Sequence, residues 1–145
     1  MSRIVTFAAT QLTISWDIEA NLDKAEKAGQ EGWLEAISLA VDQTVSDQGR
    51  TSLVLRQKPG TQTGGTVVER RRAYDRRLAE LIESSQQSGD LRDDIHPILM
   101  ARLIMGMVAW LIEWYDPELS RFTPEEIRNA VVGLVTNGAR NSDDN

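Results

Sequence analysis

The sequence contains no cysteine, a single histidine and no long run of apolar residues. Without cysteine there are no disulfides, thiolate metal sites or cysteine nucleophiles. The single histidine, His96, directly precedes Pro97, and we expect it to act as the N-cap of a helix or to be exposed rather than to be a ligand or a base. The longest strongly apolar run, residues 103–112, is too short to cross a bilayer as a helix, so we expect no membrane partner.

Motifs that carry chemistry are also lacking. No glycine-rich phosphate loop follows a strand, and Gly64-Gly65 is interpreted as a flexible lead into a helix. The sequence therefore predicts that the protein is not an enzyme, with no catalytic residue, no metal and no cofactor.

The charge pattern argues against direct binding of nucleic acid. The formal net charge is -6, and an acidic chain repels phosphate. Arginines cluster at residues 70–72 and 76–77, but acids interleave with them at helical spacing, as in Arg76 and Glu80, which is typical of a solvated, charge-paired face. An alternative is that some of these arginines contact an acidic ligand at the mouth of a pocket. The first thirteen residues lack the pattern of a secretory signal, so we expect a cytoplasmic protein.

From Trp33 onward apolar residues recur with a period near that of an α-helix. The fold class is therefore all-α, a bundle of about five helices. Thr66 with Glu69, and Thr123 with Glu126, have the spacing of capping boxes, and Gly89 is a C-terminal stop. We expect helices over residues 33–47, 51–58, 66–89, 97–115 and 124–138, followed by a disordered tail, residues 141–145.

The expected helix over residues 97–115 is apolar on all sides, with only Arg102 and Glu113 charged. Such a helix is buried on more than one side, which predicts a partner. Gly106 and Gly133 lie inside helices at an energetic cost, and close approach of another helix across a two-fold axis is the usual reason.

Residues 1–31 form a separate head. Residues 4–9 favour an extended or buried strand, and a short helix then runs to Lys27 and ends at Gly29. No second β-rich segment is available, so this strand is expected to be loosely ordered, to become helical, or to pair with its copy in a dimer.

Three segments of the remaining chain resemble the C-terminal domain of TetR/AcrR transcriptional regulators. They are ERRRAYDRRLAELIESSQQSGDLRDDIHP (69–97), LIMGMVAWLIEWYDP (103–117) and FTPEEIRNAVVGLVTNGAR (122–140). The middle segment particularly resembles the subgroup that controls fatty-acid and sterol breakdown and responds to hydrophobic or acyl-CoA-like ligands. The resemblance implies a ligand-binding and dimerisation domain over residues 32–140, with a homodimer formed by the last two helices. It also implies that DNA is contacted only through a helix-turn-helix missing from this sequence or through a full-length partner.

The resemblance assigns two sets of residues. The expected ligand-binding residues are Trp33, Ile37, Leu55, Tyr74, Leu78, Met100, Met107, Trp110 and Trp114. The expected dimer-interface residues are Ile104, Gly106, Val108, Leu111, Ala130, Gly133 and Leu134.

Two alternatives stay open. One is a helical homodimeric interaction module with no ligand. The other, more remote, is a nitrilase or amidohydrolase fragment, because IVTFAATQLTISWDIEANLDKAEK (4–27) resembles the N-terminus of nitrilase/carbamoylase amidohydrolases. That superfamily needs a Glu–Lys–Cys triad, and this sequence has no cysteine, so no catalytic residue is carried over and the chain resembles a fusion of two gene fragments.

Overall fold

The computed structural model describes residues 20–46 and 62–141, and these residues are mostly helical. The predicted all-α fold is confirmed: the pairing found in the described ranges is one isolated antiparallel bridge between Leu91 and Arg140. Residues 20–27 are helical, and a short 3-10 helix follows. The elements are η1 (Gly29–Glu31), α2 (Gly32–Ser46), α4 (Gln62–Gln87), α5 (Pro97–Trp114) and α6 (Pro124–Ala139).

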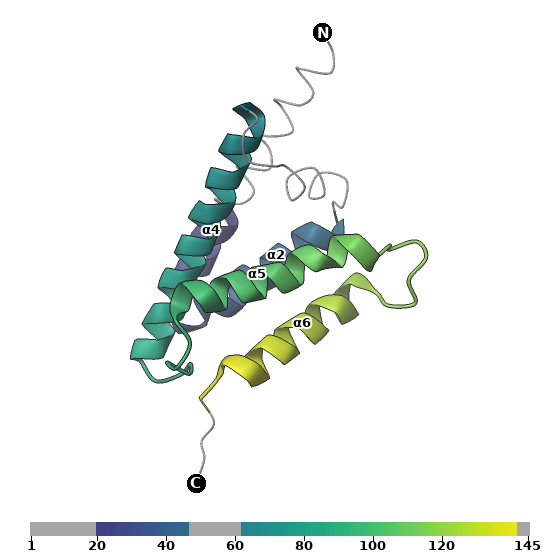
Figure 1. Cartoon of the computed structure of the whole chain (residues 1–145). Helices are drawn as coiled ribbons and strands as arrows, with labels where there is room; N and C mark the ends of the chain where they lie inside the picture. The colour runs from purple at the N-terminus through teal and green to yellow at the C-terminus, as the bar shows by residue number, and fades with distance from the viewer. Residues whose placement is uncertain (1–19, 47–61, 142–145) are drawn as a thin grey trace.

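Helix α2 is at the centre of the bundle. It packs against α4, α5 and α6, while α4 and α5 also pack against each other. Figure 1 shows α5 and α6 as an antiparallel pair joined by a loop, with α2 behind α5 and α4 descending to the start of α5. Helix α6 packs mainly on α2 and little on α5. The sides of α5 and α6 that face away from the bundle carry exposed residues.

The starts of α5 and α6 follow the predicted caps. The Nδ1 atom of His96 accepts a 3.4 Å hydrogen bond from the amide of Ile98, and Pro97 occupies the first turn. At α6 the Thr123 hydroxyl accepts from the amide of Glu126 at 3.2 Å, and the Glu126 carboxylate accepts from the amide of Thr123 at 2.7 Å. Both predicted caps are confirmed, and they fix where the α5–α6 pair begins.

The start of α4 differs from the prediction. The helix begins at Gln62, so Thr66 lies within it rather than at its N-cap. Gly64 and Gly65 lower helix propensity without forbidding helix, which is why the capping-box spacing was misleading here. The predicted stop is confirmed: α4 ends at Gln87, and Gly89 has a φ of 86°, a left-handed conformation that suits glycine.

The junction between residues 20–27 and α2 requires glycine twice. Gly29 has a φ of 67°, which lets the chain turn after the helical residues 20–27. A Cβ atom at Gly32 would collide with the main-chain carbonyl oxygen of Ala25. The absence of a side chain at Gly32 therefore allows residues 20–27 to pack against the start of α2.

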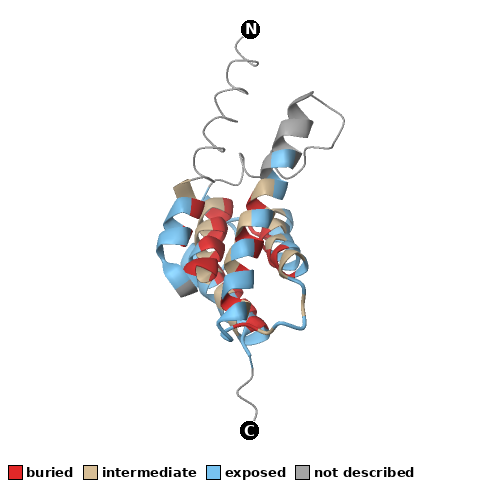
Figure 2. Ribbon diagram, turned by 90° about the vertical axis from the view of Figure 1, so that its left-hand side faces the viewer, coloured by how far each residue is buried: buried red, intermediate tan, exposed pale blue. Residues whose placement is uncertain are grey.

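The core is continuous through the described helices. Figure 2 shows the buried residues facing one another inside the bundle, with exposed residues on the outer sides. The largest fully buried side chains are Ile37, Leu78, Ile82, Leu91, Val41 and Val108.

Ion pairs join helices that are distant in sequence. Arg128 of α6 contacts the carboxylate of Asp42 in α2 at 2.9 Å. The Nε atom of Arg77 in α4 donates to Glu26 at 3.1 Å, and its Nη2 atom reaches Asp23 at 3.3 Å. Part of the predicted charge-paired face therefore binds α4 to residues 20–27.

The α4–α5 turn is tied to the end of α6. The Arg92 amide donates to the Ala139 carbonyl at 2.8 Å, and the Asn141 amide donates to the Asp90 carbonyl at 3.2 Å. These bonds make the Leu91–Arg140 bridge, which satisfies main-chain groups beyond both helix ends.

The expected strand over residues 4–9, the expected helix over residues 51–58 and the tail after Asn141 lie outside the described residues.

Candidate functional site

Five of the predicted ligand-binding residues lie in one core between α2, α4 and α5. Each of them is less than a tenth exposed and belongs to the same hydrophobic cluster. They come from three separate helices, and folding brings them together in one place. These residues are Trp33, Ile37, Tyr74, Leu78 and Met100, whereas Leu55 lies outside the described residues.

Tyr74 supplies a polar atom inside this apolar core. Its hydroxyl donates a 3.0 Å hydrogen bond to the main-chain carbonyl of Ala36 in α2. Burial raises the pKa of Tyr74 well above its ordinary value, and the charge of Asp75 adds to this effect. The side chain therefore stays a neutral donor that links α4 to α2.

Asp75 is a half-buried carboxylate at the α4–α5 contact. Burial raises the pKa of Asp75, while the charges of Arg71 and Arg102 act in the opposite direction. A half-buried acid with a raised pKa beside an apolar core is a common feature of functional sites. The sequence does not single out this residue, because Asp75 is one of several acids among the arginines of α4 and its burial arises only in the folded chain.

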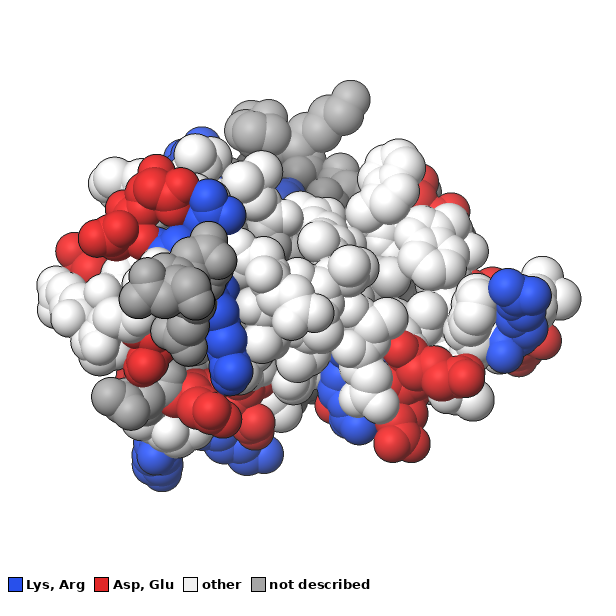
Figure 3. Space-filling model, turned by 90° about the horizontal axis from the view of Figure 1, so that it is seen from below, with Lys and Arg blue, Asp and Glu red and all other residues white. Residues whose placement is uncertain are grey.

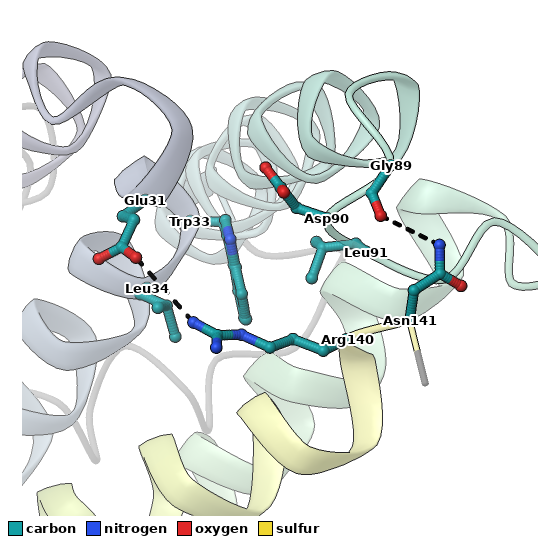
Figure 4. Close-up of a pocket in the computed structure, with 8 residues that line it drawn as sticks. All are labelled: Glu31, Trp33, Leu34, Gly89, Asp90, Leu91, Arg140 and Asn141. Carbon is teal, nitrogen blue, oxygen red and sulfur yellow. Dashed lines mark hydrogen bonds and ion pairs between the residues drawn. The ribbon is translucent and has the colours of Figure 1, made fainter. Parts of the chain in front are cut away.

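A groove of about 380 Å³ lies at the end of the bundle where α2, the α4–α5 turn and the end of α6 meet. Figure 4 shows Arg140 reaching Glu31 and the Asn141 side chain reaching Gly89. Arg140 and Glu31 are 3.9 Å apart, and the Asn141 amide donates to the Gly89 carbonyl at 3.1 Å. The residues that line the groove are Glu31, Trp33, Leu34, Gly89, Asp90, Leu91, Arg140 and Asn141. No sequence signal indicates this groove, because three separate segments form it.

Three other predicted ligand-binding residues point away from the core. Met107, Trp110 and Trp114 are 42%, 66% and 53% exposed. They lie on the outer side of α5, apart from the five predicted residues that are buried in the core. The physical reason is that α5 is apolar all round, which leaves the sequence without a signal for the side of the helix that faces inward.

Three of the predicted interface residues of α5 are buried in the protomer. Ile104, Val108 and Leu111 are 6%, 1% and 4% exposed, because they form the inner side of α5 against the rest of the bundle. In the protomer these three residues belong to the core. The outer side of α5 consists instead of Leu99, Leu103, Gly106, Met107, Trp110 and Trp114.

The remaining predicted interface residues are exposed. Ala130, Gly133 and Leu134 lie on the outer side of α6, and Leu134 is 68% exposed. A Cβ atom at Gly106 or Gly133 would meet no neighbouring atom within 4 Å. Figure 3 shows the molecule from the side on which α6 lies, with uncharged side chains over its middle and charged ones mainly toward its edges.

The loop after α5 extends this apolar region. Leu119 is 85% exposed, and Phe122 lies under the guanidinium of Arg121 at 4.8 Å. The Tyr115 hydroxyl donates to the Phe122 carbonyl at 3.1 Å and so holds the loop against the end of α5.

The length and composition of α5 also satisfy the criteria for a membrane-spanning helix, as those of core helices in soluble proteins do. It is the only helix in the described ranges that does so. Its inner side packs on α2 and α4, so one face of α5 is already occupied by protein.

Residues 34–139 match the family described as "Tetracyclin repressor-like, C-terminal domain". Among solved structures, a member of the TetR transcriptional regulator family from Streptomyces coelicolor A3 is 26% identical, with a TM-score of 0.70 over 90% of this chain and 71% of that chain. The ketosteroid transcriptional regulator KstR2 of Mycobacterium tuberculosis is 11% identical, with a TM-score of 0.76 over 86% of this chain and 66% of that chain. AibR in complex with isovaleryl coenzyme A and operator DNA is 20% identical, with a TM-score of 0.63 over 86% of this chain and 73% of that chain. No curated protein matches the sequence.

Proposed function

Because the chain belongs to the tetracycline-repressor-like C-terminal domain family of TetR regulators, we propose that it senses a hydrophobic or acyl-CoA-like molecule and forms a homodimer through α5 and α6. The double role of α5 is the observation that carries this proposal. Its inner side contributes Met100 and Val108 to the core, and its outer side exposes Trp110 and Trp114. A ligand that displaces α5 from within would thereby alter the surface that meets a partner.

The ligand class follows from the core and from two structural neighbours. AibR was solved with isovaleryl coenzyme A, and KstR2 is described as a ketosteroid regulator. In this chain the apolar residues near Tyr74 suit an acyl chain or a steroid skeleton, and the arginines beside Asp75 suit an anionic group. We assign the apolar contacts to Trp33, Ile37, Leu55, Tyr74, Leu78 and Met100.

Thermal unfolding with added ligands tests the sensing role. Isovaleryl-CoA, a longer acyl-CoA and a ketosteroid are the probes, with free coenzyme A as the control for binding through the nucleotide alone. At a concentration one hundred times the Kd, binding to the folded state adds about 2.7 kcal/mol and raises the Tm. If no probe raises the Tm of the dimer, the sensing role fails and a homodimeric interaction module without ligand replaces it.

The dimer proposal rests on large apolar side chains that stay exposed to solvent in the protomer. Burying a fully exposed aromatic side chain removes roughly 150–250 Å² from water, and at ~25 cal/mol per Å² this burial is favourable before the entropy cost of association is counted. Two tryptophans on one exposed side, Trp110 and Trp114, therefore favour a partner strongly. Gly106 and Gly133 leave room for that partner to approach the helix backbone.

We place the interface on the outer sides of both helices. It comprises Leu99, Leu103, Gly106, Met107, Trp110 and Trp114 of α5, with Ala130, Gly133 and Leu134 of α6. Replacing Trp110 by Ser is expected to convert the dimer to monomer, whereas replacing the exposed loop residue Leu119 by Ser is not. A W110S variant that keeps the mass of a dimer would exclude α5 from the interface.

DNA contact is assigned to a helix-turn-helix that lies outside the residues matched to the family, either on a full-length partner or on a longer form. The acidic balance of the sequence supports this, because a net charge of -6 disfavours phosphate. We also propose that the chain is cytoplasmic and non-enzymatic, because TetR regulators act on DNA and on small effector molecules. A binding assay with the chain alone should therefore give no sequence-specific complex.

A further inference from the structure

The exposed residues of α5 form one straight stripe along the helix. From Leu99 they recur at steps of four, three, four and four residues, which keeps them on one side of a helix with ~100° per residue. Leu99 is 51% exposed and Leu103 is 61% exposed, and both tryptophans further along the stripe are more than half exposed. The stripe comprises Leu99, Leu103, Gly106, Trp110 and Trp114, with Met107 at its edge.

The spacing of residues along this stripe is symmetric about its midpoint, which fits pairing with an antiparallel second copy. Leu103 lies three residues before Gly106, and Trp110 lies three residues after Met107. Leu99 and Trp114 lie seven residues before and after the same two positions. A two-fold axis between Gly106 and Met107 would therefore set each leucine opposite a tryptophan of the copy.

The residues at the middle are complementary in size. A Cβ atom at Gly106 would meet nothing within 4 Å, so the surface there is open. Met107 is 42% exposed beside it and has a flexible side chain. Across the proposed axis Met107 of each copy faces the open backbone at Gly106 of the other.

The only charged residues of α5, Arg102 and Glu113, complete the pattern. Both are exposed, and they lie on the same flank of the stripe. In an antiparallel pair related by a two-fold axis, the same flank of each helix faces its symmetry mate. Arg102 precedes Gly106 by four residues and Glu113 follows Met107 by six, an offset of two residues or about 3 Å along the axis. Both side chains are long enough to span that offset.

From these relationships we infer that α5 recognises α5 of a second copy of this chain, antiparallel, about a two-fold axis between Gly106 and Met107. This inference rests on the proposed homodimer and adds to it the position of the axis and the pairs that give self-recognition. In the dimer leucine faces tryptophan four times, methionine faces glycine twice, and arginine faces glutamate twice. A related chain that lacks this symmetry would pair less well, which makes the stripe a selector of its own copy.

Single cysteines test the axis directly, because the chain has none of its own. Met107→Cys places two thiols beside the axis, whereas Leu99→Cys places them about fifteen residues of helix apart, roughly 22 Å. Under mild oxidation M107C is expected to form a covalent dimer and L99C is expected to stay uncrosslinked. Light scattering on both variants before oxidation reports whether each is a dimer.

The possible results separate this inference from the proposed function. If both variants have the mass of a dimer but M107C does not crosslink, or L99C crosslinks equally, the axis lies elsewhere and this inference is overturned while the homodimer stands. If the unmodified chain is a monomer, the proposed homodimer fails as well. An unfolded variant is recognised by its circular dichroism, and Gly106→Cys then replaces Met107→Cys at the same axis.

A charge exchange provides a second readout. Arg102→Glu sets two acids opposite each other and is expected to raise the dimer dissociation constant about tenfold, as is Glu113→Arg. The double variant R102E/E113R should regain most of the lost affinity. Since Arg102 also acts on Asp75 within its own protomer, this rescue distinguishes contact across the axis from a local effect. Absence of rescue in a folded double variant would contradict the Arg102–Glu113 pair.

Discussion

The hydroxyl of Tyr74 donates a 3.0 Å hydrogen bond to the main-chain carbonyl of Ala36, and this bond joins α4 to α2 inside the core. The proposed ligand site is built around this link. Its residues are buried together, and the charge of the neighbouring Asp75 acts on the Tyr74 hydroxyl.

Replacing Tyr74 by Phe removes the hydroxyl and keeps the ring. A buried hydrogen bond contributes about 1 kcal/mol, so the free energy of unfolding should fall by that amount. Urea denaturation at neutral pH measures it. Tyr115→Phe is the matched control, since its bond to the Phe122 carbonyl lies in a loop and should contribute less. A larger loss for Tyr115 would contradict the role given to Tyr74.

Alkaline pH provides a separate test of Tyr74. Because burial raises the pKa of Tyr74 above its ordinary value of 10.0, the folded state retains a proton that the unfolded state releases first. Stability should therefore fall as the pH rises above about 10. This decline should be smaller in the Tyr74→Phe variant, and equal slopes for the two proteins would show that Tyr74 is not desolvated.

Asp75 is expected to reduce stability at neutral pH. Its pKa is raised by burial, so the folded state binds a proton more tightly than the unfolded state does, and stability rises as the pH falls through the raised value toward 3.8. Asp75→Asn should be more stable than the parent at pH 7, and this advantage should shrink on acidification. Urea midpoints from neutral to acidic pH measure both effects, and an Asn variant less stable than the parent at pH 7 would show that the arginine charges outweigh burial.

Two glycines should respond oppositely to alanine. Gly32→Ala places a Cβ atom against the carbonyl oxygen of Ala25, so it should destabilise the chain by roughly 1–3 kcal/mol. Gly138→Ala has open space and should stabilise α6 by up to about 1 kcal/mol through helix propensity. Thermal unfolding of both variants measures the difference, and a tolerated alanine at Gly32 would mean that residues 20–27 do not pack closely there.

The helices and most of their ends could be predicted from the sequence, because caps and stops are local. His96, Thr123 and Gly89 act through neighbours a few residues away, and all three were predicted correctly. Thr66 was predicted wrongly as an N-cap, since the helix continues through Gly64 and Gly65 at its start.

The site was less predictable, because it depends on how a uniformly apolar helix is rotated. The sequence of α5 has apolar residues on every side, so it gave no reason to separate Val108, which is buried, from Trp110, which is exposed. That rotation is set by the contacts of α5 with α2 and α4, which are long-range. The groove at Arg140 and the burial of Asp75 depend on similar contacts and had no local signal.

The mass of the chain in solution tests the central claim most directly. Light scattering after size-exclusion chromatography at micromolar concentration should give twice the chain mass of 16.2 kDa, and the Trp110→Ser variant should give 16.2 kDa while keeping its helical circular dichroism. A mass of 16.2 kDa for the unmodified chain would contradict the account, because the exposed side of α5 would then need no partner.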